Sequence, residues 1–304
     1  METPMARLAI PIIIGVTVAG VAGAAAFIQL TRPDPLPEDT FAGITGDPAK
    51  GERVFWASGC ASCHMAPGAQ GDAKLVLSGG QRLESPLGTF VVPNISTDAS
   101  QGIGGWSLQQ FGNAVMRGVS PENDHYYPAL PYPAYRLMAP QDVADLKAYM
   151  DTLPPSDRAD EDHETPFPFS IRRGIGLWKL VNLRDDWTVA GTLPEPAARG
   201  RYIAEAQAHC AECHTPRDIT FGLQRGRWLA GAPNPSGEGR VPNITPAALD
   251  WTEAEIANYL RTGFTPDYDV VGGTMAHVVD EFARLPESYA TDVAAYLKAV
   301  PPAQ

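Results

Sequence analysis

Short amphipathic segments recur along the chain between long stretches rich in Gly and Pro. Apolar residues at helical spacing predict helices in two sets of three, over 51–58, 107–117, 141–152, 199–208, 252–261 and 289–299. Residues that favour helix ends support these limits. Ser107 and Thr252 precede the middle helix of each set, and Gly118 and Gly263 follow it. The pattern therefore predicts an all-α fold.

The second half of the chain repeats landmarks of the first. The matching positions lie 145 to 150 residues apart and include Cys60 and Cys210, 92–95 and 241–244, Trp106 and Trp251, and Tyr149 and Tyr296. Two copies are too few for a solenoid. We therefore expect two duplicated domains, at 48–156 and 199–304, with a linker over 157–198. Because the middle of this linker is apolar, we expect it to pack between the domains or against a partner.

The N-terminal segment differs from both copies. Residues 8–30 form a run of 23 without a charge, flanked by Arg7 and Arg32. As a helix this run would be roughly 35 Å long, more than the ~30 Å hydrocarbon core of a bilayer. We predict one N-terminal transmembrane helix within 1–30 and an extended spacer over 31–47. The alternative is a cleaved signal peptide, since 22–26 offers small residues for cleavage.

Composition and charge restrict the class of protein. Hydrophobic residues make up 44% of the 304 positions and charged residues 19%, which is typical of folded domains. Asp and Glu exceed Lys and Arg by 35 to 23, so the net charge is −12. This balance argues against a nucleic-acid binder, which needs a basic face. It suits fast encounter with a basic protein partner.

The four cysteines form two pairs at one spacing, and a histidine follows each pair directly. The two runs are Cys60, Cys63 and His64, and Cys210, Cys213 and His214. C-x-x-C-H is the attachment run of c-type haem. Two thiols one helical turn apart can add to the two vinyl groups of one porphyrin, and the next imidazole then reaches the iron. A thioredoxin-like pair would need a βαβ setting, and a zinc site would need the pairs to meet. We predict two covalently bound haem c groups in two tandem class I cytochrome c domains with long loops.

A second axial ligand is expected for each electron-transfer haem, most often a methionine. Met275 is the only methionine after the second attachment run, and small residues precede it, so we predict that it ligates the second iron. No methionine stands at the corresponding place in the first copy, 128–130. Met138 is our first candidate there, although it matches the apolar Leu285. His125, or an open iron, is the alternative.

With these motifs in hand, the chain resembles the membrane-associated multihaem cytochrome c subunits of periplasmic alcohol, aldehyde, sugar and sugar-acid dehydrogenases. The resemblance covers about 48–302, and it rests on the two attachment runs and on the segments 92–95, 102–106, 127–132, 167–169 and 272–275. Many such subunits have three haems, and many carry a ligating methionine where Leu130 stands. Some have an apolar residue there and a methionine at the place of Met138.

The resemblance implies electron relay without catalysis by this chain. Electrons would pass from a periplasmic dehydrogenase or a respiratory complex to a cytochrome or oxidase, with the chain anchored in the bacterial inner membrane and its haem domains in the periplasm. No flavin, nicotinamide or molybdenum motif is visible in the sequence. The alternative is a dihaem enzyme, either a peroxidase or a thiosulfate-type dehydrogenase, that uses a weakly ligated first haem. The missing methionine at Leu130 favours that alternative.

Overall fold

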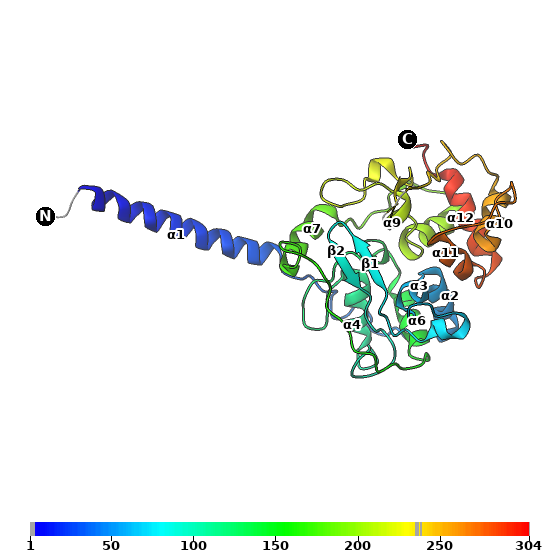
Figure 1. The fold of residues 1–304 in the computed structure, drawn as a ribbon, viewed down its shortest axis with the longest axis horizontal. Coiled ribbons are helices and arrows are strands. Elements are labelled where there is room, and N and C mark those ends of the chain that lie inside the picture. The colour runs from blue at the N-terminus through cyan, green and yellow to red at the C-terminus, as the bar shows by residue number, and fades with distance from the viewer. Residues whose placement is uncertain (1–3, 235–236, 238, 304) are drawn as a thin grey trace.

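Figure 1 shows a computed structural model of the chain, which describes residues 4–234, 237 and 239–303, with side chains from residue 15 onward. A long helix, α1 (Pro4–Leu30), projects from a body that holds the rest of the chain. Arg173 of the linker donates hydrogen bonds to the Ile28 carbonyl and to the Thr31 hydroxyl, at 2.5 and 2.9 Å. These bonds fix the C-terminal end of α1 to the body.

The predicted transmembrane helix is wrong. In the part of the chain that the structure describes, no helix is both long enough and apolar enough to cross a membrane. The described side chains of α1 come largely from Gly, Ala and Val, with Thr17 and Gln29 among them. Of the predicted segment, residues 1–3 and the side chains up to residue 14 lie outside the described part.

The first domain is built from short helices around its attachment run, as the pattern predicts. In chain order its elements are α2 (Pro48–Ala57), α3 (Cys60–His64), η1 (Gly71–Leu75), β1 (Arg82–Ser85), β2 (Gly88–Val91), α4 (Leu108–Gly112), η2 (Asn113–Arg117), α5 (Tyr132–Tyr135) and α6 (Pro140–Met150). The predicted middle helix is thus α4 followed by η2, a wider π-helical turn.

The second domain repeats this order. Its elements are α8 (Glu195–Arg201), η4 (Tyr202–Gln207), α9 (Ala211–His214), η5 (Arg225–Arg227), β3 (Ala232–Pro233), β4 (Arg240–Val241), α10 (Glu253–Thr262), α11 (Met275–Phe282) and α12 (Glu287–Ala299). The strands are an addition to the predicted all-α fold. They form two antiparallel two-stranded sheets, with Arg82 opposite Val91 in the first and Ala232 opposite Val241 in the second.

The first and last helices of each domain cross in close contact at a glycine. A Cβ atom on Gly51 of α2 would lie 1.9 Å from the Asp145 carbonyl oxygen of α6. A Cβ atom on Gly200 of α8 would lie 1.8 Å from the Asp292 carbonyl oxygen of α12. Buried residues of both domains belong to one hydrophobic cluster, so the domains are packed together rather than tethered.

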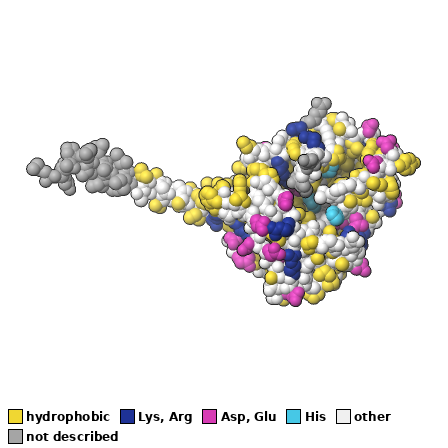
Figure 2. Space-filling model, in the orientation of Figure 1, with side chains coloured by type: hydrophobic (Ala, Val, Ile, Leu, Met, Phe, Trp, Pro, Cys, Tyr) yellow, Lys and Arg dark blue, Asp and Glu magenta, His cyan; other side chains and the backbone are white. Residues whose placement is uncertain are grey.

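The linker contains η3 (Arg172–Gly174) and α7 (Ile175–Asn182) and lies along the first domain. It then reaches the second domain, where Asp186 accepts a hydrogen bond from Arg225 at 2.9 Å. Apolar side chains gather where α1 meets this region of the body, as Figure 2 shows. The exposed apolar residues of the linker are Phe167, Phe169, Ile171, Leu177, Leu180 and Val181.

Candidate functional site: two facing attachment turns

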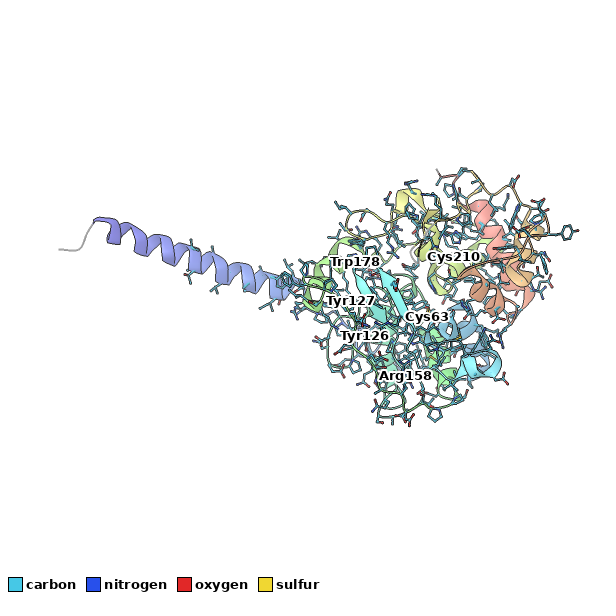
Figure 3. All side chains as sticks on the ribbon, viewed as in Figure 1. Cys63, Tyr126, Tyr127, Arg158, Trp178 and Cys210 are labelled. Atoms are coloured by element: carbon cyan, nitrogen blue, oxygen red, sulfur yellow. The ribbon has the colours of Figure 1, made fainter. Side chains whose placement is uncertain are left out.

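Each C-x-x-C-H run forms a single helical turn directly after the first helix of its domain. In the first domain the turn is α3, and Gly59 before it has a φ of 67°. In the second domain Cys210 has helical angles and precedes α9. None of the four cysteines takes part in a disulfide bond. Figure 3 places Cys63 of one turn and Cys210 of the other in the middle of the body.

Each histidine that is predicted to ligate iron lies against a proline carbonyl. The Nδ1 atom of His64 lies 2.9 Å from the Pro93 oxygen, and the Nδ1 atom of His214 lies 2.8 Å from the Pro242 oxygen. A carbonyl accepts here, so Nδ1 carries the proton and Nε2 keeps its lone pair. Burial lowers the pKa of His64 to about 4, so the ring is neutral at neutral pH. This geometry explains why 92–95 recurs as 241–244.

The thiols do not behave as a redox or zinc site. Burial raises the pKa of Cys60, and burial raises that of Cys210 to about 12. A thioredoxin-like pair needs a lowered thiol pKa. Across the described residues, no group of three or more His, Cys, Asp or Glu side chains could hold a metal ion. Paired thiols followed by an Nε2 donor fit haem c, which supplies one-electron iron chemistry when bound.

The methionine candidates lie in different surroundings. Met275 is the first residue of α11 and is half-buried against the core. Met138 precedes α6 and is 3% exposed within the core cluster, as its counterpart Leu285 is at 5%. His125 is also buried, but its Nε2 atom lies 2.8 Å from the Thr31 carbonyl oxygen, beside the end of α1.

Glu281 of the second domain reaches the attachment turn of the first. Its carboxylate accepts hydrogen bonds from the backbone N–H of Ser62 at 3.1 Å and from the Ser62 hydroxyl at 2.9 Å. The neighbouring Asp280 forms an ion pair with Lys74. Burial raises the pKa of Glu281 to about 7, although the bonds from Ser62 oppose this shift. Sequence reasoning missed Glu281, because no local pattern marks a contact between residues 219 positions apart.

A residue of the first domain, Tyr135, likewise contacts the region of the second attachment turn. The Tyr135 ring packs edge-on against His209, which precedes Cys210, with ring centres 5.5 Å apart. The Tyr135 hydroxyl donates to the Ser58 carbonyl at 2.7 Å, just before the first turn. Each turn therefore touches the other domain, and the two turns face each other.

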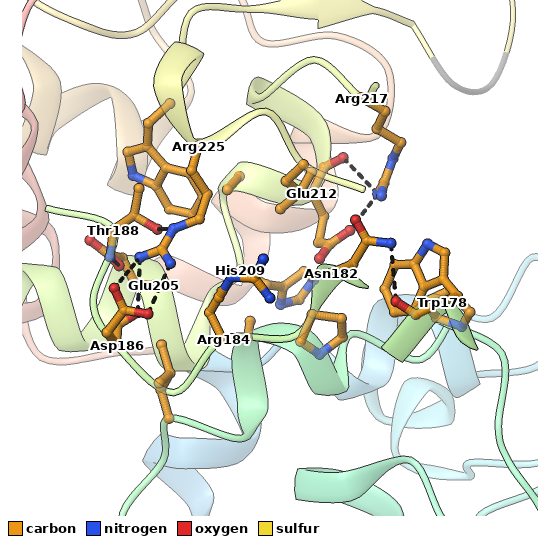
Figure 4. A pocket seen from close by; sticks show the side chains of 17 residues that line it. Trp178, Asn182, Arg184, Asp186, Thr188, Glu205, His209, Glu212, Arg217 and Arg225 are labelled. Atoms are coloured by element: carbon orange, nitrogen blue, oxygen red, sulfur yellow. Dashed lines mark hydrogen bonds and ion pairs between the residues drawn. The ribbon is translucent and has the colours of Figure 1, made fainter. Parts of the chain in front are cut away.

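A small cavity lies beside the second turn, which contributes Ala211 and Glu212 to its lining (Figure 4). Its volume is about 80 Å³, and its walls come from the first domain, the linker and the second domain. Two ion pairs form part of its lining, one between Glu212 and Arg217 and one between Asp186 and Arg225. Small-molecule sites typically measure about 300–1,000 Å³. This cavity is therefore not a substrate site of ordinary size.

Two such turns in two repeated domains define a c-type cytochrome with two covalently bound haem c groups. Residues 48–154 match the Cytochrome c family. The diheme cytochrome c-type protein of Cereibacter sphaeroides is 55% identical over 286 residues, which are 94% of this chain and 95% of that protein. The chain therefore belongs to the family of diheme c-type cytochromes and is an electron-transfer cytochrome.

Cytochrome subunits of dehydrogenases are more distant relatives. The fructose dehydrogenase cytochrome subunit of Gluconobacter japonicus is 33% identical over 270 residues, covering 83% of this chain and 52% of that subunit. The gluconate 2-dehydrogenase cytochrome c subunit of Pantoea cypripedii is 31% identical over 280 residues, covering 86% and 62%. The chain thus spans between half and two thirds of the length of these two subunits.

Proposed function

We propose that this chain relays electrons in the periplasm, from a dehydrogenase to a cytochrome or oxidase, through its two haems in series. The names of the two dehydrogenase subunits support a dehydrogenase as the donor. The net charge of −12 supports basic surfaces on the partners that bind it. A respiratory complex as the donor would fit the same charge.

The proposal rests on one observation, which is that the two attachment turns face each other. Glu281 bonds to Ser62, next to Cys63, and Tyr135 packs on His209, next to Cys210. The Cys63 and Cys213 thiols are close enough for a charge on one to shift the pKa of the other. The thioether edges of the two haems would therefore lie toward each other, which suits electron transfer between them.

We further propose one histidine and one methionine for each iron. His64 and Met138 would ligate the first iron, and His214 and Met275 the second. For the first iron, the bond between His125 and the Thr31 carbonyl supports Met138 over His125. Methionine ligation raises the reduction potential of a haem, which suits a relay that accepts electrons from a dehydrogenase.

The dihaem enzyme remains the second candidate, because Leu130 stands where the second domain has Met275. A peroxidase or a thiosulfate-type dehydrogenase would need an iron that a substrate can reach. Relay needs the opposite, a sixth position that is firmly occupied on both irons. The two functions therefore differ in their response to a small iron ligand.

The test is the optical spectrum of the reduced full chain with and without carbon monoxide. Relay predicts no change on addition of the gas, because both irons are six-coordinate. The Met275→Ala variant serves as the positive control, and it should bind carbon monoxide at one haem and show a lowered potential for that haem. Ready binding by one haem of the unmodified chain would favour the enzyme. An unchanged spectrum and potential in Met275→Ala would overturn the assignment of Met275.

A further inference from the structure

The loop that follows the middle helix has one backbone conformation in both domains. A β-bridge joins Val119 to His125 in the first domain and Phe264 to Val270 in the second. Corresponding hydrogen bonds run from the Ser120 and Thr265 N–H groups across each loop, both at 2.9 Å. Each loop also has one residue in the left-handed region at a φ of 64°, Asn123 and Tyr268 respectively. The two loops therefore have equivalent backbone conformations.

In the first domain the linker and the end of α1 cover this loop. Lys179 of α7 donates hydrogen bonds to the carbonyls of Arg117 and Gly118, at 2.7 and 2.8 Å. The Thr31 carbonyl meets the His125 ring. Val119 and His125 are consequently only 2% and 3% exposed. Helix α7 is mostly apolar, and its single lysine, Lys179, makes these bonds.

In the second domain the equivalent positions face solvent. Phe264 is 49% exposed and Val270 is 62% exposed, while Tyr268 is 87% exposed. A left-handed conformation is uncommon for a bulky residue, and such outliers concentrate at functional sites. The loop also ends shortly before Met275, the proposed ligand of the second iron.

The charges of the exposed loop favour a basic partner. Asp267 and Asp269 flank Tyr268, at the positions of Glu122 and Asp124 in the first domain. In the first domain, the positive charges of Lys179 and Arg173 act on the loop from the linker side. The second loop therefore offers an exposed surface that is both acidic and apolar, at the place that the linker covers in the first domain.

We propose that the loop 264–271 is the docking surface for a redox partner, and that the partner covers it with an apolar helix bearing a lysine or arginine, as α7 covers the first loop. This inference rests on the proposed relay, because it places electron exchange with the partner beside the second haem. Docking there would exclude water from Phe264 and Val270 and would pair a cation with the helix-end carbonyls.

The test uses a peptide of residues 172–184, capped at both ends, as a stand-in for the partner helix. It is titrated into the reduced, ¹⁵N-labelled full chain, and the amide shifts are followed by NMR. We expect saturable shifts confined to 262–271, with a Kd near or below about 1 mM. The double variant Phe264→Asp, Val270→Asp should lose these shifts. Ile219→Asp, which alters another residue that is 96% exposed, should keep them.

A second variant distinguishes a loss of binding from a loss of the fold. Tyr268→Gly removes the ring, adds no charge and suits the left-handed backbone, so it should weaken binding while the fold is retained. Shifts that are absent, or that persist in the double variant, would overturn the proposal. A dimer in sedimentation that the double variant abolishes would also overturn it, since a second copy would then be the occupant. Reversible titration of both haems with small mediators checks the relay separately, whatever the peptide does.

Discussion

At the scale of single residues, a glycine allows the first and last helices of each domain to approach closely. Gly51 and Gly200 sit where a Cβ atom would overlap a backbone carbonyl of the crossing helix. Backbone atoms cannot rotate away as a side chain can, so the helices themselves would have to move apart. The same device in both copies shows that the duplication extends to the packing.

Gly51→Ala and Gly200→Ala should each destabilise the protein by about 1–3 kcal/mol or more, because each overpacks a helix crossing. Thermal unfolding of the haem-loaded full chain measures the effect as a lower Tm. Gly174→Ala is the matched control, since a Cβ atom there meets nothing within 4 Å and its φ of −62° suits alanine. Equal Tm values for all four proteins would contradict the assigned role of the crossing.

Residue-level features that depend on near neighbours were predictable. Ser107 and Thr252 cap their helices and form capping boxes with Gln110 and Glu255. Gly118 and Gly263 take left-handed conformations after the same helices. The role of the proline carbonyls was not predictable. The sequence shows only that 92–95 recurs as 241–244, because the contact between each carbonyl and its histidine spans about 29 residues.

At the scale of elements, α11 links the two haem sites. It begins at Met275, the proposed ligand of the second iron, and Glu281 near its other end is bonded to the first attachment turn. The predicted helices do not include α11, because it is short and follows an irregular Gly-Gly-Thr run. The hairpins and α5 were missed for a related reason, since each is too short to show a period.

The buried Glu281 gives the stability a pH dependence. Its pKa is about 7 in the folded protein, above the ordinary carboxyl value, which the unfolded chain retains. The folded state therefore holds this proton more tightly, and its stability falls as pH rises from about 4.5 through 7. Glu281→Gln should flatten that part of the profile, because an amide keeps an acceptor for Ser62 and does not titrate.

Denaturant unfolding of the full chain at several pH values measures this effect, with an expected size of roughly 2–3 kcal/mol between pH 4.5 and 7. Asp280→Asn is the control, since it alters the neighbouring exposed carboxylate. If the pH dependence of stability persists in Glu281→Gln but disappears in Asp280→Asn, the titrating group is Asp280 and the assignment to Glu281 is wrong. Glu281→Ala, which removes the acceptor, should in addition lower stability at every pH.

At the scale of the whole molecule, the repeat and the two haem c groups followed from the sequence, because the attachment chemistry needs its residues in fixed order. The arrangement of the domains did not follow, since it depends on contacts such as those of Tyr135 and Glu281. The N-terminal prediction failed because, among the residues that the structure describes, no helix is both long and apolar enough to cross a membrane.

The central claim is that the two haems act in series within one chain. Pulse reduction of the fully oxidised full chain, followed optically, tests it most directly. We predict rapid entry of one electron and then a redistribution between the haems at a rate independent of protein concentration. That rate should exceed about 10³ s⁻¹, the upper range of typical enzyme turnover. A redistribution rate proportional to protein concentration would show that electrons pass only between molecules, and it would contradict the relay.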